Sequence, residues 1–434
     1  MFTRGVKCLS RNSFHRLQHR ELNGKGLNSF WDYHLHVFYL HERVTHLVIA
    51  DDIICLFCNG QLIPFGREGK ILPLKDEYDS PIILNCPMAI VSAYYNSNNN
   101  SVIIVGYHQS LPYLKILIVE IAGLKAGRTN EYREIYAEEA DTVTWDFDIP
   151  NCRGVIYNKK ERLFKVFDLK EYNQISTISL ERGIAFERGI QVERKIEWFF
   201  QSRGNMYVAI YFDGGFRRNT SDVWFKIYSK RDGELCKEGI LHLNHETMLQ
   251  FATLCGDDRI CLQQHGRNMQ VIDISGEVPQ VIPTNLEEMV EPYYLPKLDR
   301  FLCYTRSRTL HLCDMRGDIL ITFEDHPICM PVFDEFQRGT HILNEQDIII
   351  SVCDGVKLYC TINISSIITG ECLAKITTEG RSQIREAALS DQIVALAYDE
   401  RTGEIFTANE EGICCVWSKN FPYDAWMEYE DMSE

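Results

Sequence analysis

Few residues in this sequence combine types and spacings that could do chemistry. The segment His41-Glu42-Arg43-Val44-Thr45-His46 contains two histidines and a glutamate, as the helical zinc-protease motif does. In that motif the histidines stand four apart, but these stand five apart, so on a helix the second imidazole turns about 100° away from the ligand face. The surrounding composition also favours a strand, and we predict no metal site here.

Cys55 and Cys58 have the spacing of half a zinc site or of a redox pair. Their apolar neighbours predict a strand, on which residues three apart point to opposite faces, so the two sulfurs do not converge. We interpret both as buried apolar residues, like the cysteines of Gly412–Trp417. Since no N-terminal apolar stretch resembles a signal peptide, we expect the chain's 16 cysteines to be reduced.

Signatures of catalysis are missing from the sequence. It contains no Gly-rich phosphate loop, no nucleophile elbow and no dinucleotide fingerprint. We therefore predict a protein that is not an enzyme, with no catalytic residues, no metal and no cofactor.

Charge is distributed unevenly along the chain. Its 434 residues carry a net charge of −16, the wrong sign for a protein that grips phosphate backbones, so we expect neither nucleic acid as a bulk partner nor a membrane. Residues 1–26 carry six basic residues against one acid, Glu21, a charge of +5 that leaves −21 for the remainder. This segment could be a mitochondrial targeting sequence, the last helix of an adaptor-binding domain, or a solvated extension.

The elements that must position any functional residue are mostly strands. Short apolar or alternating runs separated by turn residues predict an all-β fold. The clearest runs are Thr45–Ala50, Ile53–Cys58, Ser101–Tyr107, Leu114–Ile121, Arg162–Asp168, Met206–Phe212, Asp222–Ser229, Arg259–Gln264, Met269–Ile274, Arg300–Tyr304, Thr309–Asp314, Asp347–Cys353 and Glu404–Thr407. The strongest helical pattern, Asn285–Val290, is too short to stand without tertiary support. No run approaches the ~18 apolar residues of a membrane-spanning helix, so we expect an intracellular protein of the cytoplasm or nucleus, with mitochondrial import as an alternative.

A turn recurs between these runs. Each copy follows a strand that ends near an aspartate or serine, continues through a glycine and an acid, and leads into another apolar strand. Glycine suits such a turn because it adopts positive φ without strain. The four copies are Ile227–Leu235, Val271–Val278, Leu312–Ile319 and Ile368–Ile376.

The repeats resemble the WD-repeat family, whose unit is a four-stranded propeller blade of roughly 40–45 residues. The segment Val394–Ser418 matches the family's strand, turn, strand, acid-Gly turn and Trp-ended strand. Elsewhere the Trp-Asp position is replaced, as in Phe167-Asp168 and Cys313-Asp314. The resemblance implies a single seven- or eight-bladed WD-type β-propeller closed by an N-terminal strand.

The repeats also suggest an organisation. We expect a basic extension over residues 1–33, a propeller over 34–420 and an acidic tail over 421–434, with loop insertions at Asp213–Ser221 and Gln337–Gln346. Because no fourth strand follows Trp417, we predict that His34–Leu40 pairs with Ile413–Trp417. The third strands should end near Phe65, Ile121, Asp168, Ser229, Asp273, Asp314, Ile364 and Ser418.

Two basic segments are candidates for partner binding. Leu312-Cys313-Asp314-Met315-Arg316 is similar to the Trp-Asp-x-Arg box by which many WD-repeat proteins dock on a cullin-RING ligase adaptor. In this interpretation Asp314 fixes the turn, and Arg316 makes a bidentate contact at the rim. Phe216-Arg217-Arg218-Asn219 resembles the Phe-Arg-Arg-Gly phosphoinositide motif of another propeller family, with Asn219 in place of glycine.

We therefore expect a non-catalytic interaction scaffold, specifically a substrate receptor or adaptor subunit of a cullin-RING ubiquitin ligase. Residues Cys8–Leu17 resemble the texture of the last adaptor-binding helix of F-box proteins with WD propellers. The acidic propeller favours protein partners with basic or peptide segments. The alternative is a structural propeller subunit of a coat, pore or tethering complex.

Overall fold

The computed structural model describes most of the chain from His34 to Ser418. The described residues are 34–39, 43–58, 60–66, 84–85, 88–108, 113–126, 128, 132–139, 143–158, 161, 163–179, 184–187, 190–193, 195–201, 206–212, 222–229, 232–242, 249–256, 258–264, 266–286, 290–304, 309–324, 326–327, 340–343, 347–354, 359–377, 389 and 393–418. The predicted extension over 1–33, the predicted tail over 421–434, and the candidates Arg217 and Arg218 lie outside these ranges.

The secondary structure is almost entirely β. The described residues form eight four-stranded sheets and a two-stranded one, β14-β15, together with a five-residue helix, α2 (Ile121–Lys125). Seven of the four-stranded sheets run in chain order: β2 to β5, β6 to β9, β10 to β13, β16 to β19, β20 to β23, β24 to β27 and β28 to β31. A four-stranded meander is the blade of a β-propeller, and the predicted all-β WD-type propeller is confirmed.

The chain divides into two compact units, of which the first comprises residues 1–95, 121–131 and 323–434. Its described strands are β1 (His34–Tyr39), β2 (Val44–Ala50), β3 (Ile53–Cys58), β4 (Gln61–Gly66), β5 (Leu84–Asn85), β6 (Met88–Asn96, as far as Tyr95), β28 (Thr340–Leu343), β29 (Ile348–Asp354), β30 (Cys360–Ser366), β31 (Cys372–Ile376), β32 (Ile393–Asp399), β33 (Glu404–Asn409) and β34 (Ile413–Ser418).

The second unit comprises residues 96–120 and 132–322. Its described strands are β7 (Ser101–His108), β8 (Tyr113–Glu120), β9 (Tyr132–Glu139), β10 (Val143–Asp148), β11 (Arg153–Asn158), β12 (Leu163–Asp168), β13 (Gln174–Ser179), β14 (Ile184–Glu187), β15 (Ile190–Glu193), β16 (Lys195–Gln201), β17 (Met206–Phe212), β18 (Asp222–Ser229), β19 (Leu235–His242), β20 (Leu249–Leu254), β21 (Arg259–Gln264), β22 (Gln270–Asp273), β23 (Gln280–Pro283), β24 (Val290–Leu295), β25 (Arg300–Tyr304), β26 (Leu310–Cys313) and β27 (Ile319–Thr322).

The strands observed agree with the strands expected. Each of the thirteen runs named from the sequence overlaps a strand, and the third strand of each four-stranded sheet ends within two residues of its predicted end. One expected loop insertion, Gln337–Gln346, is wrong in part, because β28 lies inside it and pairs with β29 from Thr340↔Ser351 to Leu343↔Ile348. The Thr-His-Ile-Leu run was missed because it is only four residues long, and its pairing with the next strand, β29, is what makes it a strand.

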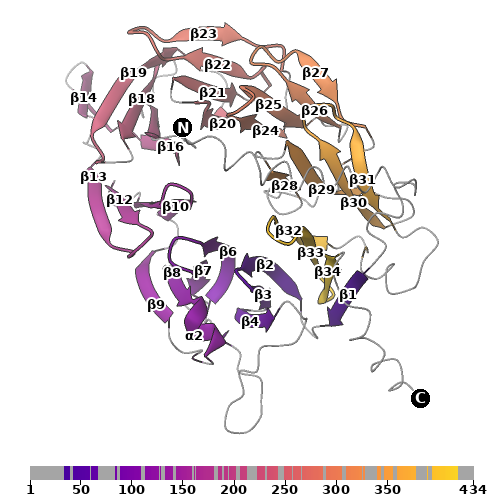
Figure 1. The fold of residues 1–434 in the computed structure, drawn as a ribbon. Helices are drawn as coiled ribbons and strands as arrows, with labels where there is room; N and C mark the ends of the chain where they lie inside the picture. Colours follow the sequence, from indigo (N-terminus) through magenta and orange to yellow (C-terminus); the bar gives the residue numbers. More distant parts are fainter. Residues whose placement is uncertain are drawn as a thin grey trace, which may run out of the picture. The chain divides into compact units, whose positions relative to one another are not determined.

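The N-terminal strand completes the last sheet, whose order is β1-β34-β33-β32. Strand β1 pairs antiparallel with β34, from His34↔Ser418 to Tyr39↔Ile413, and Figure 1 shows the indigo β1 beside the yellow β34. The predicted pairing of His34–Leu40 with Ile413–Trp417 is confirmed over the described residues. Strand β34 therefore has backbone hydrogen bonds to β1 on one side and to β33 on the other, and it is not an edge strand of the last blade.

Apolar side chains pack on both faces of this last sheet. Phe406 and Val416 lie in a core cluster with Ile54 and Leu56 of β3, while Trp417 lies in another cluster with Ile350 and Ile362 of the β28 to β31 sheet. The fully buried Trp417 donates its Nε1–H to the Thr407 hydroxyl, 3.0 Å away, so its one polar group is satisfied.

Candidate interaction site

The four repeated runs each form the turn that joins the third strand of a sheet to its fourth strand. In three of them the glycine N–H donates to the backbone oxygen of the residue that ends or follows the third strand: Gly233 to Ser229 (2.9 Å), Gly317 to Asp314 (3.0 Å) and Gly370 to Ser366 (2.8 Å). The expectation of tight, glycine-containing turns is confirmed, and these turns hold exposed side chains on fixed backbone.

Asp314 organises the turn between β26 and β27 with its side chain. Its Oδ1 accepts hydrogen bonds from the backbone N–H groups of Arg316 (2.8 Å) and Asp318 (2.9 Å). Its own N–H donates to the Asp318 carbonyl at 3.1 Å. A carboxylate that accepts two backbone N–H groups is a strong local constraint. The sequence-based role of Asp314 as the residue that fixes the turn therefore agrees with the geometry.

Arg316 is held at both of its backbone polar atoms while its side chain is exposed. Its N–H is bound by Asp314, as above, and its carbonyl oxygen accepts from the N–H of Asn285 at 2.7 Å. The side-chain amide of Asn285 also donates to the Asp318 carboxylate at 2.8 Å. The connection after β23 thus braces the turn from the neighbouring sheet, and the guanidinium projects from an anchored position.

Gly317 is the point of closest approach between this turn and the connection. Its φ is +84°, and a Cβ added there would lie 2.7 Å from the backbone nitrogen of Leu286 and also against the Leu286 side chain. Leu286 is buried, and its carbonyl accepts from Met269 N–H at 2.9 Å. A glycine is required here both for its backbone conformation and for the missing side chain.

Sequence reasoning missed Asn285. It was interpreted as the start of a short helical run, but residues 284–286 form a non-helical connection, and β24 begins at Val290. Hydrogen bonds to Met269 and Arg316 compete successfully with a helical turn. Since both partners are distant in the sequence, no local signal identifies this role.

The other residues considered for chemistry have structural surroundings. His46 lies on β2, and its ring nitrogens contact the Val91 carbonyl (2.8 Å) and the Thr45 hydroxyl (3.1 Å). Cys55 and Cys58 are fully buried on β3, and burial raises the pKa of the Cys55 thiol to about 12. Their interpretation as core residues is confirmed. Within the described ranges, no group of three or more His, Cys, Asp and Glu side chains could hold a metal ion.

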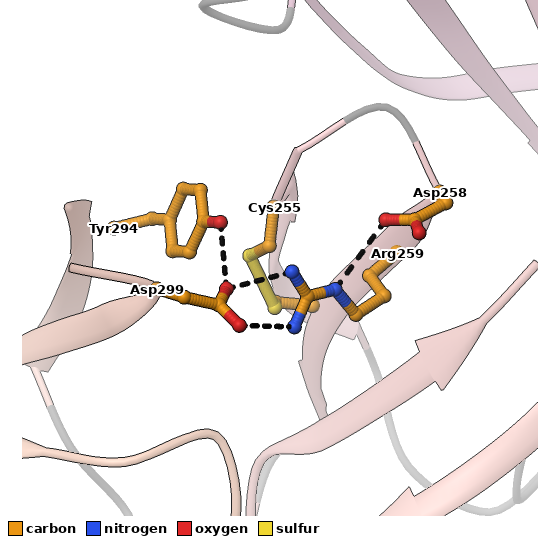
Figure 2. Close-up of a disulfide and its surroundings, with 6 residues drawn as sticks. Cys255, Asp258, Arg259, Tyr294 and Asp299 are labelled. Atoms are coloured by element: carbon orange, nitrogen blue, oxygen red, sulfur yellow. Dashed lines mark hydrogen bonds and ion pairs between the residues drawn. A yellow bond between two sulfur atoms is a disulfide. The ribbon is translucent and has the colours of Figure 1, made fainter. Parts of the chain in front are cut away.

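The sequence did not predict an ionic cluster that joins the β20 to β23 sheet to the β24 to β27 sheet. Arg259 makes a bidentate pair with Asp299, at 3.1 and 2.6 Å, and the Tyr294 hydroxyl donates to the same carboxylate at 2.8 Å (Figure 2). The hydrogen bond from Arg259 outweighs burial and lowers the pKa of Asp299. Burial and the bond to Asp299 raise the pKa of Tyr294 to about 12. The cluster joins the turn after β24 to the start of β21, and its groups satisfy one another.

Beside this cluster, Cys255 and Cys261 form a disulfide (Figure 2). The expectation of reduced thiols is wrong for this pair, whereas eleven other described cysteines are not in disulfides. The hairpin of β20 and β21 sets Leu254 opposite Ile260 and Thr253 opposite Cys261, so Cys255 is a diagonal neighbour of Cys261, with Cα atoms 6.4 Å apart. That separation lies within the range that a disulfide can bridge. The available signal in the sequence was the Gly-Asp-Asp run of residues 256–258 between the two cysteines.

The four-stranded meanders and their capped turns define a β-propeller of the WD40 class. The chain belongs to the family described as a domain of unknown function, DUF7899, whose model matches residues 6–417. No curated protein matches it.

Two solved structures are similar to the chain. The C-terminal WD40 domain of Sif2 has a TM-score of 0.50 at 9% identity, over 90% of this chain and 99% of that one. BamB from Moraxella catarrhalis has a TM-score of 0.44 at 9% identity, with the same coverage. At such identity the likeness to the Sif2 domain shows the fold alone. Among the described helices, none has the length and apolar composition needed to cross a membrane.

Proposed function

We propose that this protein is a non-catalytic interaction scaffold that docks a partner on the Asp314–Asp318 turn, and that the partner is the adaptor of a cullin-RING ubiquitin ligase in the cytoplasm or nucleus. The observation that carries the proposal is the exposed Arg316 side chain on a backbone bound at both its N–H and its carbonyl. Because the Arg316 backbone is already held in place, binding costs it little conformational freedom. The planar guanidinium can form two parallel hydrogen bonds with a partner carboxylate.

The substrate side of this scaffold would recognise basic segments. Two other turns that join third and fourth strands expose carboxylates, at Asp232, Glu234 and Glu277. Such acidic groups steer cationic peptides and disfavour anionic ones. Arg316 would thus bind the adaptor through an opposite charge, and the acidic turns would select the substrate.

The test is affinity purification of the full chain from cells, with mass spectrometry of the bound proteins. In Arg316→Ala we expect the adaptor to be lost, because the bidentate contact is removed. Arg316→Lys should retain little of it, since an ammonium lacks the planar fork. Arg401→Ala is the matched control, because Arg401 is also exposed and also donates its N–H to an aspartate two residues earlier, Asp399 (2.9 Å).

Two results would overturn the proposal. One is adaptor recovery with Arg316→Ala equal to that with the wild type. The other is equal loss with Arg401→Ala, because a general loss of positive charge would then explain the effect. A stable set of coat, pore or tethering subunits in place of a ligase would support the structural-subunit alternative.

A further inference from the structure

One buried face of the β28 to β31 sheet is apolar, and the other combines polar side chains with the buried Ile349 and Cys353. On one face Ile350, Ile362, Ile364 and their neighbours pack in a hydrophobic cluster with Trp417 of the last sheet. The strand register places Thr340, Ser351 and Asn363 on the other face, directly opposite one another across β28, β29 and β30. We call these three residues the polar row.

The polar row is as buried as the apolar face. Relative exposure is 8% for Thr340, 0% for Ser351 and 0% for Asn363, and Thr361, two residues before Asn363 on the same face, is 6% exposed. Natural cores seldom bury so many polar side chains on one sheet face unless each finds a hydrogen-bond partner. The side chains of the polar row therefore need hydrogen-bond partners that fit within a buried sheet face.

The described residues do not supply those partners for the hydroxyls. The side-chain oxygens of Thr340, Ser351 and Thr361 are buried, and no described residue hydrogen-bonds to them. Further along the same face the need is met directly, because the Ser365 hydroxyl contacts Nδ1 of His326 at 3.1 Å. A buried hydroxyl without a partner is destabilising because it has lost its hydrogen bonds to water, so three of them on one face would be a substantial penalty.

The spacing of the row fits water. Facing residues on paired strands have Cβ atoms about 4.5–5.5 Å apart, and although Thr340 and Ser351 face each other, their hydroxyls do not bond to each other. A water molecule that bonds two oxygens at about 2.8 Å each spans such a gap. Thr340 and Ser351 offer two of the about three hydrogen bonds that a buried water typically makes. Thr361 lies on β30, two strands from Thr340, and is within reach of a second water only.

We propose that this face of the β28 to β31 sheet is an internal hydration site, in which ordered water bridges Thr340 to Ser351 and continues toward Thr361. The site is independent of the Arg316 turn and of the proposed docking function. In this blade, one sheet face then contains polar side chains bridged by water, and the other face packs through apolar side chains alone.

The test is the thermal unfolding midpoint of the full chain with Thr340→Val, Ser351→Ala and both together. If water bridges the two hydroxyls, each single change lowers the midpoint, because the water loses a partner. The double change then lowers it by less than the two single shifts combined, since both hydroxyls share that water. A crystal structure should show ordered water within about 2.8 Å of both oxygens.

Ser92→Ala combined with Thr340→Val is the matched control for coupling. The Ser92 hydroxyl is also buried without a described partner, but it lies on β6, in another sheet. Its effect should add to that of Thr340→Val without coupling. A raised midpoint in Thr340→Val or Ser351→Ala would overturn the proposal, because removing a dry unpaired hydroxyl is stabilising. Additive shifts in the Thr340 and Ser351 pair, or a row without ordered water, would also overturn it.

Discussion

Two turns of this protein look alike in sequence and differ in what holds them. Asp314-Met315-Arg316-Gly317 and Asp399-Glu400-Arg401-Thr402-Gly403 each begin with an aspartate whose Oδ1 accepts the N–H of the arginine two residues later. Each has a glycine at positive φ, +84° at Gly317 and +73° at Gly403. Locally, the two turns are built by the same rules.

Their surroundings separate them. The Arg316 carbonyl is bound by Asn285 and Gly317 packs on Leu286. At Gly403 the nearest atom to an added Cβ is the Tyr398 hydroxyl at 3.8 Å, an ordinary contact. Among the described residues, no hydrogen bond reaches the Arg401 carbonyl. A capped turn therefore becomes a rigid platform only when a neighbouring segment braces it.

The glycines should show the largest difference between the two turns. Gly317→Ala adds left-handed backbone strain and a clash with Leu286, and we expect a loss of about 3 kcal/mol in the free energy of unfolding. Gly403→Ala adds the strain alone, about 1–2 kcal/mol. Urea unfolding of the full chain measures both. Equal losses for the two variants would show that the contact of Gly317 with Leu286 does not constrain the Asp314–Asp318 turn.

The aspartates test what the turns share. Asp314→Ala removes the acceptor of two backbone N–H groups, and we expect a loss of about 1–2 kcal/mol. Asp399→Ala removes the acceptor of the Arg401 N–H and should cost about 1 kcal/mol. Asp314→Asn is the control, because its side-chain oxygen still accepts these hydrogen bonds, and its unfolding midpoint should stay close to that of the wild type. If Asn is as damaging as Ala, the carboxylate acts through its charge and not through the turn.

Asn285 should have the smallest effect. Asn285→Ala removes one exposed side-chain bond to Asp318 but keeps the backbone bond to Arg316, so we expect a loss of about 0.5 kcal/mol. Asn285→Asp places a second carboxylate beside Asp318. Its additional cost should shrink when salt is added, because salt screens repulsion between exposed charges. A cost that is independent of salt would show that the bond itself, and not its electrostatics, braces the turn.

Local patterns predicted much of the fold and part of the site. Strand composition and the recurring glycine turns predicted the sheets, and the lack of a fourth strand after Trp417 predicted its pairing partner near His34. Asp314 was identified because its role is local, two to four residues along the chain. Asn285 and the Arg259–Asp299 pair were missed because each depends on contacts between segments distant in the sequence. The Cys255–Cys261 disulfide was missed although it lies within one hairpin.

The sequence by itself determined which segments become strands, where the turns fall and which aspartate caps them, because these depend on propensity and hydrogen bonds over a few residues. Only the tertiary structure decided that Arg316 is braced and Arg401 is not, and that one buried face of the β28 to β31 sheet contains polar side chains. Those properties depend on which segments pack together. Packing between distant segments sets burial and the partners of each polar group, and no local pattern specifies it.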